Sequence, residues 1–553
     1  MTKSSPSPLK VLLEKVGIDM LPDTADVVVV GAGLAGLYAV HKFRSCGLSV
    51  QGFEAASGVG GTWYFNRYPG ARCDVESVDY SYSFDDDLQE EWNWSERYAT
   101  QPEILAYLEH VADRFDLRSA YAFDTRVVSA EFDDDNHTWQ VRTDQGHEVT
   151  ARYCVMATGA LSATNLPDIP GRDTFAGRIL HTGDWPHGGV DFTGQRVGVI
   201  GTGSSGIQSI PLIAEQASTL HVFQRTPNFS VPACNRPLTD RERQELKADY
   251  QERRRKSWAS GGGSPFVSNP KSALEVTAEE REQEFEHYWT KGGVLFGKTF
   301  ADQMSNLQAN DLARDFAERK IRAVIDDPEV ADALIPTDHP IGTKRIVTDS
   351  GYFETYNRDN VSLVNLRETP IVAIDETGIA TADARYDLDV LVFATGFDAI
   401  TGALSRIDIR GSQGRCLNQA WESGPQTLYG LAVAGFPNMF LVTGPGSPGV
   451  LANMVLGSEQ HINWIADAIA YLDTHGYTRM EAEEKAAADW MAQCFDIASR
   501  TLFLKADSWY VGANIEGKPR VFMLYAGGFG NYGQVIAEAA AAGYQGFTLA
   551  TAP

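Results

Sequence analysis

Two segments of the chain repeat one pattern of apolar and polar positions. Residues 26–54 form an uninterrupted apolar run, a glycine turn, an apolar-periodic helix and a second apolar run that ends at Glu54. Residues 196–225 repeat this order, and their second run ends at Arg225. A fully apolar run of strand length followed by a helix is typical of a buried parallel strand. Each segment therefore predicts a βαβ unit, and the fold class is α/β with two Rossmann-like, doubly wound sheets.

Between and after these units the pattern changes. Alternating positions predict strands over 124–132 and 138–143, joined by a hairpin at aspartates 133–135 that we interpret as a solvated turn. Further elements are predicted toward the C-terminus: strands over 361–365, 370–374 and 388–394, and helices over 451–472 and 533–542.

The block of residues 231–340 carries helix signals instead of strand signals. Helices are predicted over 239–258 and 277–289, both opening with a T-x-x-E capping box, and over 311–326. The basic cluster 253–256 is interpreted as a solvated helix face and not as a binding site. This block predicts a helical insertion in the second nucleotide-binding unit.

The glycine turns predict two dinucleotide sites. Both have the spacing G-x-G-x-x-G between a strand and a helix, with Ser204 opening the second helix; the glycines are Gly31, Gly33 and Gly36, then Gly201, Gly203 and Gly206. In this setting the first glycine makes the tight turn, the second admits a pyrophosphate at the helix N-terminus, and the third lets the helix pack closely.

The two units differ in the charge that ends the second strand. A carboxylate such as Glu54 accepts hydrogen bonds from an unphosphorylated ribose, as in FAD or NAD. A guanidinium such as Arg225, followed by Thr226, suits the 2'-phosphate of NADP. The alternative for Arg225 is a strand end in solvent. FAD with NADP(H) is the pair of cofactors that we predict, and the chemistry then belongs to the flavin.

Composition and charge exclude several classes of function. The 553 residues carry a net charge of -26, which repels nucleic acid and anionic membranes. Six cysteines without a CxxC pair argue against a disulfide framework, a metal site or a dithiol redox centre, and leave O2 as the electron acceptor. The first twenty residues lack the uncharged apolar core of a signal peptide. We expect a cytoplasmic monomer or small homo-oligomer.

Two longer motifs identify a family. Residues 60–74, GGTWYFNRYPGARCD, match [AG]-G-x-W-x4-[FY]-P-[GM]-x3-D, and residues 175–186, FAGRILHTGDWP, match F-x-G-x3-H-T-x2-W-P. The chain thereby resembles the Baeyer-Villiger monooxygenases, class B flavoprotein monooxygenases. Other matching stretches are ATG at 157–159, GTKR at 342–345, ATGFD at 394–398 and WYVGANIEGKPR at 509–520. The stretches ARCDVES, FETYNRDNV at 353–361 and GPGSP at 444–448 are closest to the steroid and phenylacetone monooxygenase branch, and Ala160 departs from relatives that carry glutamine there.

The resemblance implies an activity and a division into domains. Members reduce FAD with NADPH and form a C4a-peroxyflavin, which inserts one oxygen atom of O2 next to a ketone carbonyl to give an ester or lactone. We expect a cyclic, steroid-like or aryl ketone. Residues 1–150 and 395–553 would form a discontinuous FAD-binding domain, and residues 151–230 and 341–394 an NADP-binding domain, with 231–340 as its insertion.

The resemblance also assigns roles to single residues. Arg345 would be the catalytic cation beside the flavin, and Asp74 its partner; the alternative for Asp74 is a carboxylate that caps a turn. Leu451 and Met454 would line the substrate pocket, or belong to the buried start of a helix. The remaining assignments are Lys344 on the NADP phosphate, Trp509 on its ribose, Trp63 and Tyr80 at the cofactors, and His181 and Trp185 in an interdomain hinge.

Two competing functions remain at this point. A related flavin monooxygenase could oxidise amines or sulfides, although Trp185 with Pro186 and Arg345 with Asp74 count against it. A nucleotide-binding regulatory protein without activity is disfavoured because both glycine turns are complete.

Overall fold

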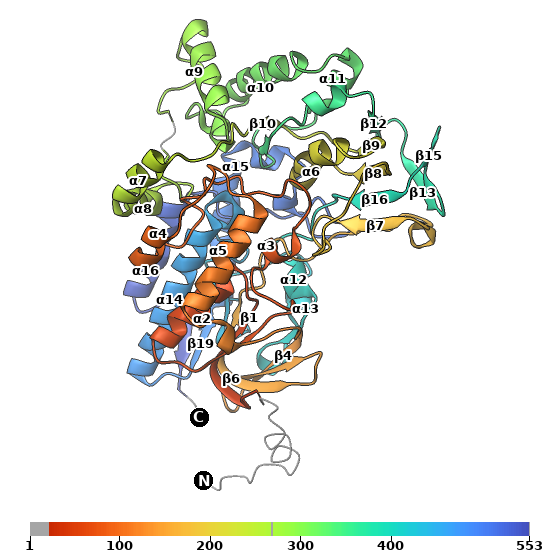
Figure 1. The fold of residues 1–553 in the computed structure, drawn as a ribbon. Helices are drawn as coiled ribbons and strands as arrows, with labels where there is room; N and C mark the ends of the chain where they lie inside the picture. The colour runs from red at the N-terminus through yellow and green to blue at the C-terminus, as the bar shows by residue number, and fades with distance from the viewer. Residues whose placement is uncertain (1–20, 267–268, 552–553) are drawn as a thin grey trace.

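The computed structural model (Figure 1) describes residues 21–266 and 269–551. It contains two main sheets, and one strand of each sheet leads directly into a glycine turn. In the first sheet β1 lies between β6 and β2 and is parallel to both. Its strands are β1 (Thr24–Val30), β2 (Val50–Phe53), β3 (Tyr121–Ala122), β4 (Val127–Asp133), β5 (Thr138–Thr143), β6 (Glu148–Met156), β17 (Asp408–Arg410) and β18 (Met439–Leu441). β4, β5 and β6 run antiparallel as a meander.

The second sheet is parallel throughout, in the order β12, β9, β8, β16, β7. Its strands are β7 (Arg178–His181), β8 (Arg196–Ile200), β9 (Thr219–Gln224), β12 (Val361–Asn365) and β16 (Val390–Phe393). An antiparallel trio of β13 (Ile371–Asp375), β14 (Gly378–Thr381) and β15 (Arg385–Asp387) joins its last two strands in the chain. The predicted α/β class with two βαβ units is confirmed.

Helices cover both sheets. α2 (Leu34–Ser45), α5 (Gln101–Arg114), α14 (Met454–His475), α15 (Glu484–Ser499) and α16 (Phe529–Ala541) surround one large core beside the first sheet, and α6 (Ser204–Ala214) packs on the second. The valines of β1 explain this placement, since Val27, Val28 and Val29 are fully buried between helices and the meander. Smaller elements include α3 (Thr62–Phe65), α4 (Asp86–Glu91), α12 (Gly402–Ser405), α13 (Leu417–Ala420), β19 (Arg479–Ala482) and β20 (Phe547–Ala550).

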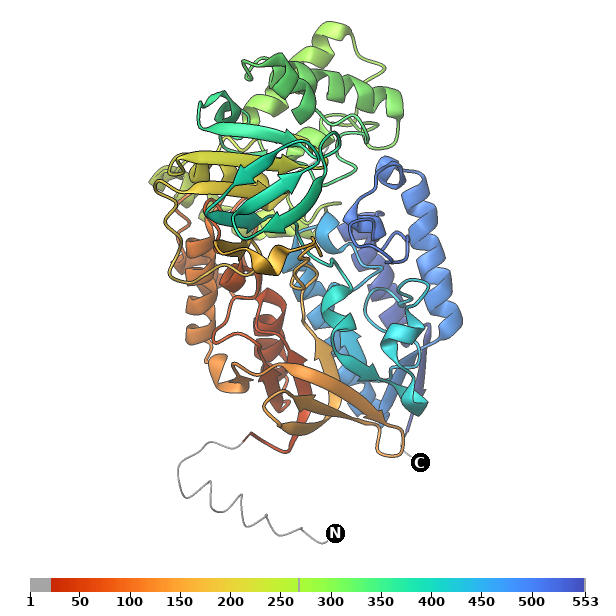
Figure 2. The ribbon, with the colours of Figure 1, turned by 90° about the vertical axis from the view of Figure 1, so that its right-hand side faces the viewer.

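The first sheet is assembled from distant parts of the chain. β17 pairs with β4 and β18 pairs with β6, although both follow residue 395. β6 continues to Met156, beyond residue 150, which is the predicted end of the first segment of the FAD-binding domain. Figure 2 shows the same arrangement from the side, with the N-terminal segments (red and orange) beside the C-terminal segments (cyan and blue) in the lower half and the second sheet above them.

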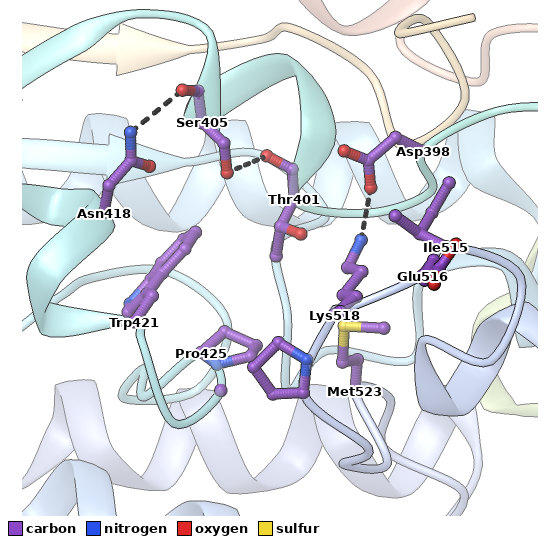
Figure 3. Close-up of a pocket in the computed structure, with 13 residues that line it drawn as sticks. Asp398, Thr401, Ser405, Asn418, Trp421, Pro425, Ile515, Glu516, Lys518 and Met523 are labelled. Carbon is purple, nitrogen blue, oxygen red and sulfur yellow. Dashed lines mark hydrogen bonds and ion pairs between the residues drawn. The ribbon is translucent and has the colours of Figure 1, made fainter. Parts of the chain in front are cut away.

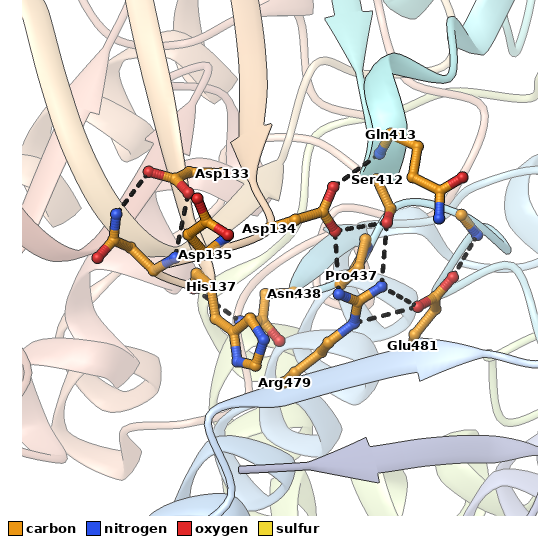
Figure 4. A network of polar contacts seen from close by, with 12 residues as sticks. Asp133, Asp134, Asp135, His137, Ser412, Gln413, Pro437, Asn438, Arg479 and Glu481 are labelled. Atoms are coloured by element: carbon orange, nitrogen blue, oxygen red, sulfur yellow. Dashed lines mark hydrogen bonds and ion pairs between the residues drawn. The ribbon is translucent and has the colours of Figure 1, made fainter. Parts of the chain in front are cut away.

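A polar network ties the β4–β5 hairpin to the C-terminal part (Figure 4). Asp134 accepts hydrogen bonds from Ser412 Oγ at 2.5 Å, from the Gln413 amide at 2.7 Å and from Arg479 at 3.0 Å. The interpretation of the aspartates as a solvated turn is therefore wrong for Asp134. It remains right for Asp133, which accepts the amides of Asp135 and Asn136 within the turn.

The block 231–340 is helical, as predicted. It contains α7 (Asp240–Ala248), α8 (Tyr250–Ala259), α9 (Ala278–Lys291), α10 (Leu307–Arg322) and α11 (Pro328–Leu334), and the parallel pair β10 (Ser230–Pro232) and β11 (Val347–Asp349) closes its base. Both capping boxes are confirmed, at Thr239 and Thr277. The single helix predicted over 239–258 breaks at Asp249, because α8 turns to bury Tyr250 and Arg254.

The basic cluster of α8 corrects a second expectation. Arg254 is 6% exposed, and Arg253 forms an ion pair with the fully buried Asp79. Only Arg255 and Lys256 are exposed, with Glu252 as their partner. The prediction of a solvated helix face is therefore right for Arg255 and Lys256 and wrong for Arg253 and Arg254.

Three further expectations concern membrane spans, cysteine or metal sites, and the N-terminal segment. None of the helices within the described residues is long and apolar enough to cross a membrane. Within residues 21–266 and 269–551 the cysteines are free, and no group of three metal-ligating side chains occurs. The N-terminal segment 1–20, where we saw no signal peptide, lies outside the described residues.

Candidate functional site

The two glycine turns have the same geometry. Gly31 and Gly201 both have a φ of 108°, a left-handed value that favours glycine, and a Cβ on either would lie 2.6 or 2.5 Å from the carbonyl oxygen of Ala157 or Ala394. These alanines begin the two ATG motifs, and their amides continue each sheet by donating to Val30 and Ile200. The first residue of each ATG motif therefore packs directly against the first glycine of one turn. The sequence alone did not reveal this role.

The second glycine of each turn leaves room for a ligand. A Cβ on Gly203 would meet nothing within 4 Å, and one on Gly33 would meet Gly61 Cα at 3.5 Å. The helices that follow begin at Leu34 and at the exposed Ser204, and no side chain caps their first amides. Open space before uncapped helix amides fits a pyrophosphate, so the residues present suit a dinucleotide at each turn.

Glu54 is placed at the first turn but is already engaged. Its Oε2 accepts the Ala32 amide at 2.6 Å and its Oε1 the Ala56 amide at 2.8 Å. The side chain is buried, and burial raises its pKa although these hydrogen bonds oppose the shift. Glu54 therefore braces the glycine turn, and its bond to a ribose stays a prediction.

Arg225 and Lys344 form a cationic group at the second turn. Arg225 is exposed beyond the end of β9, and within the described residues it has no hydrogen bond or ion pair. The Thr226 carbonyl accepts from Thr202 in the glycine turn at 3.1 Å, which places this strand end beside the turn. Burial lowers the pKa of Lys344; the charges of Asp338 and Asp507 oppose this shift, and those of Arg225 and Arg367 add to it. Arg225, which has no ion-pair partner among the described residues, and the neighbouring Lys344 suit an anionic ligand.

Arg345 and Asp74 form a bidentate ion pair. Arg345 Nε donates to Asp74 Oδ2 at 2.5 Å, and Nη2 donates to Oδ1 at 2.8 Å. Asp74 ends the first long motif, and Arg345 lies just before β11. The two residues that the resemblance pairs are in contact, and their roles stay a prediction.

The ion pair fixes the charge of both residues. Burial acts to raise the pKa of Asp74, but the charge and hydrogen bonds of Arg345 outweigh it and lower the pKa. Burial acts to lower the pKa of Arg345, and Asp74 reverses the shift and raises it. Arg345 therefore carries a permanent positive charge, and its 30% exposed side chain keeps one face open.

Arg345 also contacts the loop predicted to line the pocket. Its Nη1 donates to the Val450 carbonyl at 2.7 Å. Leu451 follows in the same turn, Met454 begins α14, and both pack in one apolar cluster with Ala160 and Trp509. Met454 opens a helix and Leu451 lies in the turn before it, which agrees with the helix-start alternative, while their place in a substrate pocket stays a prediction.

Aromatic residues complete the surroundings. Trp63 is buried and donates from Nε1 to the Tyr80 hydroxyl at 3.2 Å. Trp509 stacks edge-on against Tyr510, with ring centroids 4.5 Å apart. Tyr510 is 2% exposed beside Arg345, and burial raises its pKa to about 12, with Arg345 opposing the shift. We missed Tyr510 and the Val450 carbonyl; the only signal for them was their position inside matching stretches.

The second long motif lies where the chain crosses between the two sheets. His181 ends β7; its Nδ1 accepts the Gly183 amide at 2.9 Å, and its Nε2 faces Thr395 Oγ1 at 3.4 Å. Burial lowers the pKa of His181. The buried Trp185 donates its amide to the Phe65 carbonyl at 3.1 Å, which links the two motifs. His181 therefore contacts Thr395, where the chain leaves the second sheet, and Trp185 contacts the end of α3.

A separate cavity of about 300 Å³ lies near α12 and the loop 515–519 (Figure 3). None of its lining residues is a predicted site residue. Lys518 donates to Asp398 Oδ1 at 2.6 Å, and Asn514 donates to the Phe397 carbonyl at 2.7 Å. The cavity therefore lies beside the hydrogen bonds that join the 509–520 stretch to the ATGFD stretch.

Comparison with known proteins gives consistent results. A family model described as pyridine nucleotide-disulphide oxidoreductase matches residues 25–250. A solved structure described as oxidized steroid monooxygenase bound to NADP is 62% identical, with a TM-score of 0.92 over 95% of this chain and 99% of that chain. A Baeyer-Villiger monooxygenase of Pseudooceanicola batsensis is 44% identical over 94% of this chain and 95% of its own length. A phenazine N-monooxygenase of Lysobacter antibioticus is 43% identical over 96% of this chain and 97% of its own length.

Proposed function

Because the chain belongs to the Baeyer-Villiger monooxygenases, we propose that it inserts one oxygen atom of O2 next to the carbonyl group of a cyclic, steroid-like or aryl ketone. The chain is an FAD- and NADPH-dependent oxidoreductase. The observation that carries the proposal is the fixed cation of Arg345, paired with Asp74 and bonded to the loop that holds Leu451.

The reaction needs a permanent cation more than it needs a proton donor. Bound FAD supplies the electrons from NADPH and the activation of O2. Oxygen transfer to a ketone develops negative charge on oxygen atoms, and Arg345 stabilises that charge because its pKa is raised by Asp74 and it cannot lose its proton. Asp74 holds the guanidinium plane, so little reorganisation is needed at the moment of reaction.

The binding sites for the two cofactors are proposed from the glycine turns. For FAD we assign Gly31, Gly33 and Gly36 with Glu54, and the linked aromatics Trp63 and Tyr80. For NADP we assign Gly201, Gly203, Ser204 and Gly206, and the cations Arg225 and Lys344 with Thr226 around the 2'-phosphate. Trp509 is assigned to its ribose. Support comes from the open space at Gly33 and Gly203 and from the guanidinium of Arg225, which has no partner in the described part of the chain.

The domains follow the two sheets. We place the FAD-binding domain over 1–150 and 395–553, the NADP-binding domain over 151–230 and 341–394, and the insertion over 231–340. The pairing of β17 and β18 with the first sheet supports the discontinuous first domain, and β6 argues for moving its inner boundary past Met156. We assign His181 and Trp185 to the hinge, since His181 contacts Thr395 after β16 and Trp185 bonds to Phe65 of the first long motif.

A product screen tests the function. The FAD-loaded enzyme is incubated with NADPH and O2, and with ketones graded by ring size that include a steroid and an aryl ketone. Chromatography should reveal an ester or lactone for at least one of them. An aromatic nitrogen heterocycle and an amine form the second arm, since one relative is named for N-oxidation. N-oxide formation without any ester would overturn the proposal.

A further inference from the structure

Two arginines of α8 join the helical insertion to the first nucleotide-binding part. Arg253 donates from Nε and Nη2 to the two carboxylate oxygens of Asp79, both at 2.7 Å. Arg254 donates to Ser81 Oγ at 2.7 Å and to the Asp79 carbonyl at 3.3 Å. Asp79 is fully buried, so the loss of Arg253 would leave a buried carboxylate unpaired.

The same aspartate reaches the start of α14. The Asp79 carbonyl accepts from Asn453 Nδ2 at 2.6 Å. Asn453 is 1% exposed, and its Oδ1 caps α14 by accepting the Val455 amide at 3.0 Å. Asn453 stands between Leu451 and Met454 in the chain, so its bonds anchor the segment that carries both side chains.

The turn after α8 makes a second contact with the same residue. Gly262, next to α8 in the chain, accepts the Asn453 amide at 2.9 Å. Gly263 lies so close that a Cβ on it would stand 2.9 Å from Asn453 Cβ. Two neighbouring carbonyls of this turn, on Ser260 and Gly261, accept the first amides of α16 at 2.9 Å. Figure 1 shows α8 beside α16. The insertion therefore holds the starts of two helices of the first part.

We propose that Arg253 is a positioning residue that sets the ketone specificity of the enzyme through Asp79 and Asn453. The guanidinium fixes Asp79, the Asp79 carbonyl fixes Asn453, and Asn453 fixes the turn that presents Leu451 and Met454. This inference rests on the proposed function, because it assigns those two residues to the ketone pocket. Arg253 itself does not touch substrate, and its effect is confined to the shape of one wall.

Two variants separate positioning from folding. The double variant Arg253→Met with Asp79→Asn removes both charges together, and Glu76, the second carboxylate that Arg253 binds, keeps its ion pair with Arg97. Asn453→Ser keeps an oxygen that caps α14 and removes the amide that reaches Asp79. The matched control is Arg255→Met, on the same helix, where the side chain is 69% exposed and pairs with Glu252.

The measurements use FAD-loaded enzyme and a ketone with two different migrating groups. Both test variants should keep the rate of flavin reduction by NADPH, raise KM for the ketone by about three- to thirtyfold, and shift the ratio of the two esters. Combining the variants should add little, because they act on one chain of contacts. Arg255→Met should match wild type.

The outcomes distinguish this inference from the proposed function. A wild type that makes no ester overturns both. A wild type that makes ester, with test variants that lose thermal stability but keep its KM and ester ratio, overturns the positioning role alone. If the double variant does not fold, the KM and ester ratio of Asn453→Ser decide.

Discussion

Arg345 and Asp74 are 271 positions apart in the chain and hold each other through two parallel hydrogen bonds of 2.5 and 2.8 Å. Asp74 belongs to the first nucleotide-binding part, and Arg345 follows the helical insertion of the second. The pair therefore joins the two parts at the proposed reaction centre, and it forms only when both are in place.

The first prediction concerns the charge of Arg345. Arg345→Ala should retain FAD and be reduced by NADPH, because the glycine turns and Arg225 are intact. Ester formation should fall by about 10² to 10³ or more, the usual loss when a preorganised charge donor is removed. Arg345→Lys should also lose most activity, since an ammonium does not reproduce the planar fork. Asp74→Ala should show a milder loss, because it orients Arg345 without meeting substrate.

Rapid-mixing spectroscopy of flavin reduction and reoxidation, combined with product chromatography, checks this prediction. Ester yields near wild type in Arg345→Ala would remove Arg345 from the reaction and leave cofactor binding untouched. A variant that also fails to accept electrons from NADPH would show that the cation serves the coenzyme instead.

The second prediction concerns coenzyme selection. Arg225→Ala should raise KM for NADPH and leave KM for NADH nearly unchanged, because only NADPH carries the 2'-phosphate. A lost charge-assisted hydrogen bond costs about 1.5 to 3 kcal/mol. The matched control is Arg178→Ala. Arg178 is exposed at the start of β7, so it lies at the end of the parallel sheet opposite to Arg225. Equal changes for both coenzymes would show that Arg225 does not meet the phosphate.

The third prediction uses the glycines of the second turn. Gly203→Ala should fold with wild-type stability, since its φ is -84° and a Cβ would meet nothing within 4 Å. It should nevertheless bind NADPH poorly, because the added methyl enters the space assigned to the pyrophosphate. Gly206→Ala should instead destabilise the protein, since its Cβ would lie 2.3 Å from the Gly201 carbonyl oxygen. Thermal unfolding and NADPH titration distinguish the two. Unchanged NADPH binding by Gly203→Ala would contradict the assigned site.

Local patterns predicted local structure well. The valines before Gly31, the two glycine turns and the capping boxes at Thr239 and Thr277 act within a few residues, so the chain displays them directly. The contact of Arg345 with Asp74 came from the resemblance and not from any local pattern.

Contacts between distant segments explain what the sequence did not reveal. Arg253 looks like a solvated residue because its partner Asp79 lies 174 positions earlier. Asp134 was misread for the same reason, since Ser412 and Arg479 arrive from the C-terminal part. Glu54 is the expected carboxylate. Its hydrogen bonds to backbone amides depend on how the glycine turn folds, so the sequence does not reveal them.

The last prediction concerns His461, a fully enclosed residue of α14. Its Nδ1 accepts a hydrogen bond from the Thr443 amide at 3.0 Å, so the ring proton of the neutral histidine is on Nε2. Nε2 lies 2.8 Å from the Tyr532 hydroxyl, and this hydroxyl donates to the Tyr429 carbonyl at 2.6 Å. Burial lowers the pKa of His461 to about 4, from 6.5 in the unfolded chain. Between these values the unfolded chain binds more protons than the folded one, so stability must fall as the pH falls.

When the pH falls from 7 to 5, His461 should lower the free energy of unfolding by about 2 kcal/mol. Denaturant unfolding at both pH values checks the slope in wild type, in His461→Gln and in His475→Gln, which alters an exposed histidine on the same helix. His461→Gln should be less stable than wild type at pH 7, because the Thr443 amide loses its acceptor, but its stability should depend less on pH. An equal pH dependence in wild type and His461→Gln would mean that His461 does not stay neutral in the folded protein, whereas His475→Gln should keep the wild-type slope.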